Sequence, residues 1–399
     1  MDRPAHAATA ATIVVVGLLA LASAMGVGRV AVTPLLPLMQ AHDGLSLGQG
    51  AWLATANYLG YAAGALACSV RPPAPHAAAR AGLIAVAVST LAMGVAEGYP
   101  AWLVLRFVAG VASACVLVGV SGWALAALGA RGRAGWSGGV FSGVGIGIAL
   151  AGVAGLVAGI EAVAPATVWL LLGAASAAVA AIGWLPLSAD ATAAPAKAAV
   201  LRRWSPGDAR LVAGYGAFGF GYIIPATFLP AMARDAIADP SVFGWIWPAF
   251  GATAAVSTAL VAIAFRRASP ARLWTASILL MAAGVLAPVL DPGLAGLLVS
   301  ASLVGGTFMV ATLAGMQEAR RRAGTAAPRL MAAMTAAFAL GQLAGPVVVA
   351  AATAAGAGGI AGPSLAGAAG LLGAAFALRD RRTDPTTRHA ATCGQGPRP

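Results

Sequence analysis

The sequence predicts an all-helical integral membrane protein, with twelve transmembrane helices arranged as two six-helix halves. Three observations lead to this fold class. First, 60% of the 399 residues are apolar and 9% are charged, whereas soluble domains have about 45–50% apolar and about 25% charged residues. Second, the apolar residues form repeated runs of about 20, which is the length of a membrane-spanning helix. Third, an internal repeat relates the two halves of the chain.

The helices are placed by cutting the chain at charged residues and prolines between the apolar runs. The predicted spans are 11–39, 47–69, 81–97, 100–130, 135–160, 165–187, 208–232, 242–265, 273–290, 293–319, 329–352 and 361–379. The longest polar break separates the sixth span from the seventh. The predicted organisation is therefore an N-terminal half over 1–187, a cytoplasmic linker over 188–207, a C-terminal half over 208–379 and a cytoplasmic tail over 380–399.

The basic residues predict how the chain is oriented. Of the 24 Lys and Arg residues, all except Arg29, Arg106 and Arg234 fall in segments on one side of the membrane. Short loops rich in Lys and Arg stay cytoplasmic, so both termini are predicted to be cytoplasmic, in a multi-pass protein of the bacterial inner membrane. The formal net charge of +12 then reflects membrane topology, and we expect no binding to nucleic acid.

The internal repeat appears when the chain is compared with itself. The matching pairs share a constant offset (219 − 26 = 193) and are Gly26 and Gly219, Gly28 and Gly221, Leu36 and Leu229, Pro37 and Pro230, Met39 and Met232, and Trp52 and Trp245. Halves that each contain six helices have the same orientation and form parallel repeats. In transporters with such repeats, the substrate site lies near the bilayer midplane between the halves.

Cysteine and histidine usage argues against several other classes. The three cysteines, Cys68, Cys115 and Cys393, do not suggest a disulfide framework. The four histidines lie in connecting segments or tails with no spacing suited to a metal, so neither a metal site nor a cofactor is predicted. The first apolar run is too long for a cleaved signal peptide. An intramembrane enzyme is disfavoured because no nucleophile, base and orienting group fall together on inward helix faces.

Several strings resemble the YbfB/YjiJ family of major facilitator transporters. They are GVGRVAVTPLLPLMQ at 26–40, GLSLGQGAWLATANYLGYAAGAL at 44–66, YGAFGFGYIIPATFLPAM at 215–232, GGTFMVATLAGMQEARRR at 305–322 and MTAAFALGQLAGPVV at 334–348. The resemblance covers most of the chain. It implies the major facilitator fold and a role in transport, but it supplies no ligand.

General motifs of this superfamily match in part. Arg106 followed by Gly110 resembles the pattern of the fourth helix. The loop motif after the second helix begins at Gly64 but has Cys68 where an aspartate belongs, so the gating role of that aspartate is not carried over. The fifth helix, SGVGIGIALAG at 142–152, lacks the Gly-Pro pair typical of drug antiporters. This difference argues against a multidrug exporter.

Two arginines lie inside apolar helices. Arg29 is about 15 Å and Arg106 about 9 Å from the outer helix ends, at 1.5 Å per residue. An arginine at a helix centre costs about 2.5–3.5 kcal/mol on insertion scales and therefore faces a cavity or a partner. All twelve acidic residues fall in loops or near helix ends. One hypothesis is that Arg29, with Arg106, binds an anionic substrate. The alternative is that each arginine bonds carbonyls freed where helices bend.

Aromatic and amide side chains are further candidates for substrate contact. Asn57 and Tyr61 are four residues apart and share a helix face, and Tyr215 and Tyr222 are seven apart on the seventh helix. Tyr222 occupies the repeat position of Arg29, so the two are predicted to face each other across the axis between the halves. The alternative for these residues is hydrogen bonding between helices.

Two more polar candidates lie in the tenth and eleventh predicted helices, Thr307 and Gln342. The complete predicted substrate-binding set is Arg29, Asn57, Tyr61, Arg106, Tyr215, Tyr222, Thr307 and Gln342.

The leading functional hypothesis is a secondary transporter that moves a small organic anion by alternating access. It is energised by gradients, since the sequence contains no ATP-binding loop of the Walker type. The alternatives are proton-coupled efflux of amphipathic or drug-like compounds and a non-transporting membrane sensor. The expected partners are a small-molecule substrate, the lipid bilayer and, for proton-coupled transport, protons. A monomer is expected, and the substrate, direction and coupling ion are left open.

Overall fold

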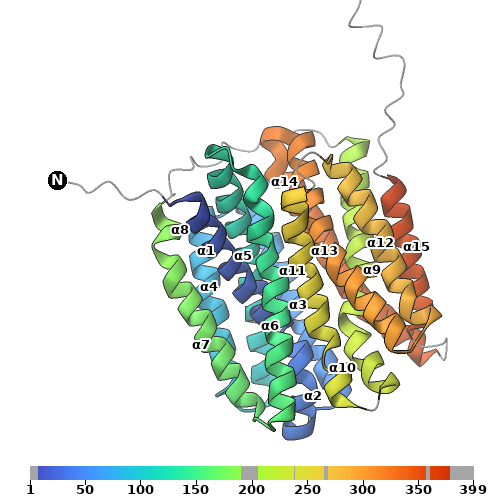
Figure 1. The fold of residues 1–399 in the computed structure, drawn as a ribbon. Helices are drawn as coiled ribbons and strands as arrows, with labels where there is room; N and C mark the ends of the chain where they lie inside the picture. The colour runs from blue at the N-terminus through green and yellow to red at the C-terminus, as the bar shows by residue number, and fades with distance from the viewer. Residues whose placement is uncertain (1–7, 190–204, 238, 265–267, 356–359, 378–399) are drawn as a thin grey trace, which may run out of the picture.

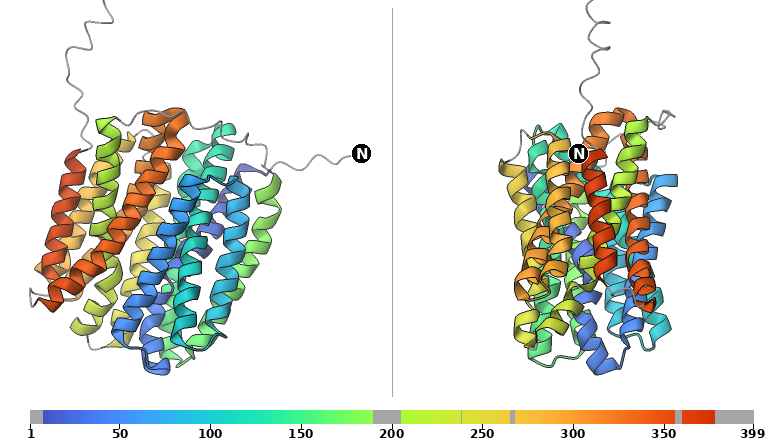
Figure 2. Two further views of the ribbon diagram at one scale, coloured as in Figure 1. Left: turned by 180° about the vertical axis from the view of Figure 1, so that it is seen from behind. Right: turned by 90° about the vertical axis from the view of Figure 1, so that its right-hand side faces the viewer.

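A computed structural model describes residues 8–189, 205–237, 239–264, 268–355 and 360–377. Over these residues the chain is helical and contains no strand. The views in Figures 1 and 2 show one bundle of long helices that run from one end of the molecule to the other. The predicted all-helical class is therefore confirmed.

The first half begins with a span built from three consecutive helical segments. The elements of this half are α1 (Ala10–Leu21), η1 (Ala22–Val30), α2 (Val32–Asp43), α3 (Leu47–Val70), α4 (Pro75–Met93), α5 (Tyr99–Ala130), η2 (Ala134–Trp136), α6 (Ser137–Ile160), α7 (Pro165–Trp184) and α8 (Pro186–Ala189). The segment η1 is a π-helix, which the uniform span predicted at 11–39 did not anticipate.

The second half has a similar series of long helices. Its elements are α9 (Pro206–Ala236), α10 (Pro240–Phe243), α11 (Ile246–Ala264), α12 (Pro270–Leu290), α13 (Leu294–Ala323), η3 (Gly324–Ala326), α14 (Ala327–Ala354) and α15 (Ala361–Ala377). Most of the linker predicted at 188–207 and all of the tail at 380–399 lie outside the described residues.

The third predicted span starts too late. It was placed at 81–97, whereas α4 begins at Pro75, because proline is favourable in the first helical turn. Arg80 was therefore assigned to a loop but lies inside α4. Its guanidinium stacks over Trp184, with Cζ 4.3 Å from the ring centroid, and donates to the Trp184 carbonyl. These contacts explain how a charged residue is accommodated in this helix.

Ten helices of the described chain are long and apolar enough to cross a membrane, judged by length and composition. The predicted helices outside this set are α3 and α15. Helix α3 carries the polar groups of Asn57, Tyr58 and Tyr61, and α15 has 17 residues, which is at the short end of the range for spanning helices. The count of twelve spans stays a prediction.

The helices pack in corresponding ways in the two halves. In the first half, α5 packs against α3 and α4, and α4 packs against α7; in the second, α13 packs against α11 and α12, and α12 packs against α15. The opening span lies against α6, as α9 lies against α14, and the halves meet along the pairs α6–α11 and α3–α14. A parallel repeat would produce this pattern, and the repeat itself stays a prediction.

Glycines allow the close approach at the α6–α11 contact between the halves. A Cβ on Gly145 would lie 2.2 Å from the Ala255 amide nitrogen, and one on Gly251 would lie 2.3 Å from the Ala149 nitrogen. In lipid, where no hydrophobic force drives helices together, such small residues supply van der Waals contact between backbones. Glycine at these positions therefore sets the distance between the two halves.

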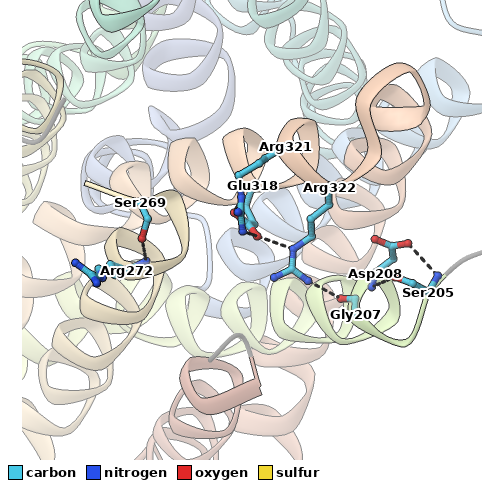
Figure 3. A network of polar contacts seen from close by, with 8 residues as sticks. All are labelled: Ser205, Gly207, Asp208, Ser269, Arg272, Glu318, Arg321 and Arg322. Atoms are coloured by element: carbon cyan, nitrogen blue, oxygen red, sulfur yellow. Dashed lines mark hydrogen bonds and ion pairs between the residues drawn. The ribbon is translucent and has the colours of Figure 1, made fainter. Parts of the chain in front are cut away.

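One end of the second half is joined by a network of charged groups (Figure 3). The buried carboxylate of Glu318, in α13, accepts from Arg321 Nη2 at 2.7 Å and from Arg322 Nε at 2.6 Å. Arg322 also donates to the Gly207 carbonyl at 3.3 Å. This contact connects the C-terminal end of α13 to the N-terminal end of α9, where Asp208 Oδ2 accepts from the backbone amide of Ser205.

Candidate functional site

The centre of the candidate site is the π-helix η1 between α1 and α2. Its nine residues include Gly26, Gly28 and Arg29. The two glycines have no side chain, and a Cβ on Gly26 would lie 2.3 Å from the backbone of Gly147 in α6. π-helical segments are rare and occur frequently at functional sites. The local structure therefore marks the region that carries one of the two membrane arginines.

Arg29 lies buried where the two halves meet. It is 6% exposed, and its Nη2 donates to Oε1 of Gln342, a residue of α14. The guanidinium also stacks on α3, with Cζ 3.8 Å from the ring centroid of Tyr61 and 5.8 Å from that of Tyr58. Within the described part of the chain, no carboxylate forms an ion pair with Arg29. The cation is thus held by a neutral amide and by aromatic faces.

Arg106 and Asn57 converge on one carbonyl of the π-helix. Asn57 Nδ2 donates to the Gly28 and Arg106 carbonyls, both at 3.0 Å. Arg106 Nη1 donates to the Gly28 carbonyl at 3.3 Å, and its Cζ lies 4.8 Å from the ring centroid of Trp169. For Arg106 these contacts agree with the alternative that it bonds carbonyls freed at a helix distortion, and for Asn57 with hydrogen bonding between helices. Nε and Nη2 of Arg106 are buried without a hydrogen-bond partner among the described residues.

Tyr222 lies in α9, in the second half of the chain. It is buried in α9 and stacks on Phe308 of α13, with ring centroids 5.0 Å apart, and on Phe338 of α14, at 5.9 Å. Phe338 lies one helical turn before Gln342, the partner of Arg29. The structure thus places Arg29 and Tyr222 against the same helix, α14. That they line a central cavity stays a prediction.

Tyr215 and Thr307 are bonded within their own half. The Tyr215 hydroxyl donates to the Thr312 carbonyl at 2.8 Å, and its ring stacks on Trp274 at 5.0 Å. Thr307 Oγ1 donates to the Leu303 carbonyl of its own helix at 2.6 Å. For Tyr215 these contacts agree with the alternative of hydrogen bonding between helices. Neither residue forms a direct contact with Arg29 in the structure.

Three contacts of the site were not predicted from the sequence. Tyr58 lies beside Arg29 and is three residues before Tyr61, a spacing that places both on one helix face. That spacing could have identified it. Phe308 and Phe338, which stack on Tyr222, gave no such signal, because a phenylalanine in an apolar helix is an ordinary packing residue.

The long apolar helices, with arginines buried among them, are typical of a multi-pass membrane protein. Residues 21–379 match the family described as "Uncharacterised MFS-type transporter YbfB". The chain belongs to this family and is a transporter, not an enzyme. The resemblance noted in the sequence is thereby confirmed.

The comparison with curated proteins found no match. Among solved structures, the chain is similar to the crystal structure of the human organic anion transporter MFSD10 (TETRAN). The TM-score is 0.67 at 15% sequence identity, and the match covers 95% of this chain and 100% of that chain. A likeness at this identity shows the fold alone, which is that of a major facilitator transporter.

Proposed function

We propose that the protein is a secondary transporter that moves a small organic anion across the bacterial inner membrane by alternating access. The observation that carries this proposal is the buried guanidinium of Arg29, which donates to the neutral side chain of Gln342 across the two halves. A charge inside a membrane protein is costly and marks a substrate pathway or a partner. An anionic substrate would supply the missing negative charge.

A carboxylate satisfies Arg29 better than Gln342 does. It offers two anionic oxygens in the planar geometry of the guanidinium, whereas the amide offers one neutral oxygen. We infer that the substrate carboxylate takes the position of Gln342 Oε1. This exchange breaks the hydrogen bond between η1 and α14, so substrate binding changes the contact between the halves. A ligand that binds one arrangement better than the other shifts their populations accordingly.

The aromatic rings near Arg29 can contact the part of the substrate that does not carry the carboxylate. The Tyr61 ring stacks against Arg29 in the first half, and in the second half Tyr222 stacks on Phe308. Aromatic faces contribute large apolar contact area, and the tyrosine hydroxyls supply polar tips. The similar structure, MFSD10, is that of an organic anion transporter, which makes carboxylates the first class of compound to test.

The test measures thermal stabilisation of the purified protein by small carboxylates and by lipophilic cations. We expect a carboxylate to raise the melting temperature of the unmodified protein, Arg29→Ala to lose this shift, and Arg29→Lys to recover only part of it, since an ammonium lacks the bidentate fork. Arg234→Ala is the matched control, because Arg234 is exposed and donates to Gln40 at 3.4 Å. An undiminished shift in Arg29→Ala would refute the proposed site.

Proton-coupled efflux of amphipathic compounds is the second candidate function. It is favoured by the rings packed around Tyr222, which include Phe218, Phe308 and Phe338. The candidate proton carriers in this mechanism are the acids near helix ends, Glu97, Glu161 and Glu318, of which Glu318 is buried and paired with two arginines. Stabilisation by lipophilic cations that survives Arg29→Ala would favour efflux over anion transport.

The proposed topology has twelve spans, two parallel six-helix repeats and cytoplasmic termini, in a monomer. Two observations support it. The start of α1 and the end of α15 lie at the same end of the bundle (Figure 1). Trp52 and Trp245, which the predicted repeat relates, are 63% and 57% exposed, as expected of residues in aromatic belts at membrane interfaces.

Reporter tags after Arg3, near Lys197 and after Arg388 should all report the cytoplasm. A periplasmic signal from any of them would overturn the topology.

A further inference from the structure

Two thiols face each other between α3 and α5, away from the arginine contacts. Cys68 Sγ donates to Cys115 Sγ at a distance of 3.7 Å. Both cysteines carry free thiols. Their closeness follows from the packing of the two helices: a Cβ on Gly60 would lie 2.0 Å from the Phe107 carbonyl oxygen, and one on Gly64 would lie 2.6 Å from that of Val111. The contacts between α3 and α5 therefore repeat every four residues on both helices. Cys68 and Cys115 are the next pair in this series, four residues after Gly64 and Val111.

We propose that Cys68 and Cys115 are a reversible modification site, oxidised by hydroperoxides to an intramolecular disulfide between α3 and α5. A disulfide requires the sulfurs to approach to about 2.05 Å. From 3.7 Å, this is a movement of about 1.7 Å, within reach of a rotation about each Cα–Cβ bond. Cys68 stands where the loop motif of related transporters has an aspartate, so a reactive sulfur occupies a position that usually carries charge.

The two cysteines have different roles in this oxidation. Cys115 is the more exposed thiol and accepts the hydrogen bond from Cys68, so its thiolate is the group that a hydroperoxide meets. Attack by this sulfur on the peroxide breaks the O–O bond, releases an alcohol and leaves a sulfenic acid. The Cys68 sulfur then attacks the sulfenic sulfur and expels water. In sum, two thiols and one hydroperoxide give one disulfide, one alcohol and one water.

The disulfide would fasten two helices of the same half. Helix α3 carries Asn57, Tyr58 and Tyr61 and packs against α14 of the other half, while α5 carries Arg106. Because both sulfurs belong to the first half, the crosslink adds a constraint inside that half and none between the halves. The proposal is thus independent of which substrate the protein moves.

The experiment counts thiols in the full-length Cys393→Ser protein, treated with tert-butyl hydroperoxide, denatured and labelled with N-ethylmaleimide for mass spectrometry. We expect two adducts before oxidation, none after oxidation and two again after dithiothreitol. In Cys68→Ser the Cys115 sulfenic acid cannot be resolved, so dimedone should trap it. In Cys115→Ser, trapping at Cys68 should be several-fold slower.

A displaced thiol provides the matched control. In the Cys393→Ser protein, Ala67→Cys combined with Cys68→Ser moves the sulfur one position along α3, which rotates it by about 100° around the helix, onto an exposed position. This variant keeps two thiols on the same helices but should oxidise to an intramolecular disulfide at least tenfold more slowly. Two adducts remaining after oxidation of the Cys393→Ser protein, or equal rates in the displaced variant, would overturn the proposal.

Discussion

Replacing Gln342 by glutamate would place a carboxylate of the protein itself opposite Arg29. In the structure Arg29 Nη2 donates to Gln342 Oε1, and Gln342 is buried with 1% exposure. Glutamate has nearly the same shape as glutamine, so Gln342→Glu changes the charge of the acceptor and little else. If the substrate carboxylate takes the place of Gln342 Oε1, the introduced carboxylate must compete with it.

The size of the effect follows from the charges involved. Opposite unit charges about 4 Å apart attract by about 4 kcal/mol at an effective dielectric constant of about 20. The cost of burying a second ion offsets part of this gain. If the introduced carboxylate binds Arg29 more strongly than the neutral amide by about 1.4 kcal/mol after this offset, the affinity for a competing carboxylate ligand falls tenfold. We therefore expect the Kd for a carboxylate ligand to rise at least tenfold in Gln342→Glu.

Gln342→Leu tests the same contact, but it should not weaken carboxylate binding. It removes the acceptor without adding charge, and losing a hydrogen bond to a charged group costs about 1.5–3 kcal/mol. The ligand-free protein should therefore melt at a lower temperature, while carboxylate binding should equal or exceed that of the unmodified protein. Calorimetric titration of both variants provides the measurement. Equal carboxylate affinity in Gln342→Glu and Gln342→Leu would refute the idea that the substrate displaces Gln342.

Two further predictions concern the packing that supports the site. Arg106→Lys removes the planar group that donates to the Gly28 carbonyl and should lower thermal stability while retaining the ligand-induced shift, which a thermal melt with and without ligand would show. Gly145→Val puts a side chain where a Cβ would lie 2.2 Å from the Ala255 nitrogen and should destabilise the fold by about 1–3 kcal/mol. Gly159→Val, whose nearest neighbour would be 4.0 Å away, should melt close to the unmodified protein; similar melting of the two variants would contradict this reasoning.

The sequence contained most of the information needed to place the helices. Runs of apolar residues with charged or proline-containing breaks located the long helices to within a few residues at most boundaries. It could not show that Arg80 lies inside a helix, because its carbonyl partner and ring, both from Trp184, come from α7. The π-helical segment η1 was also missed, since the sequence around Gly26 and Gly28 reads as an ordinary apolar helix with small residues.

The sequence could nominate polar residues for the candidate site, but it could not show which side chains contact one another. The internal repeat paired Arg29 with Tyr222, and in the structure both contact α14, through Gln342 and Phe338. Gln342 is the direct partner of Arg29, although only its polarity singled it out. Spacing could not show that the Tyr215 hydroxyl bonds the Thr312 carbonyl, because that choice depends on how α9 and α13 are set against each other in three dimensions.

At the two positions that the predicted repeat relates, the halves of the chain carry different side chains. The first half presents the guanidinium of Arg29, and the second presents Tyr222 with its stacked neighbours Phe308 and Phe338. A ligand with a carboxylate and an apolar body would contact both halves, whereas a small carboxylate such as acetate would reach Arg29 alone. Because only differential contacts shift a conformational equilibrium, the larger anion should stabilise the association of the halves more strongly. If the proposed site is right, we therefore expect the preferred substrate to carry a negative charge and an apolar surface in one molecule.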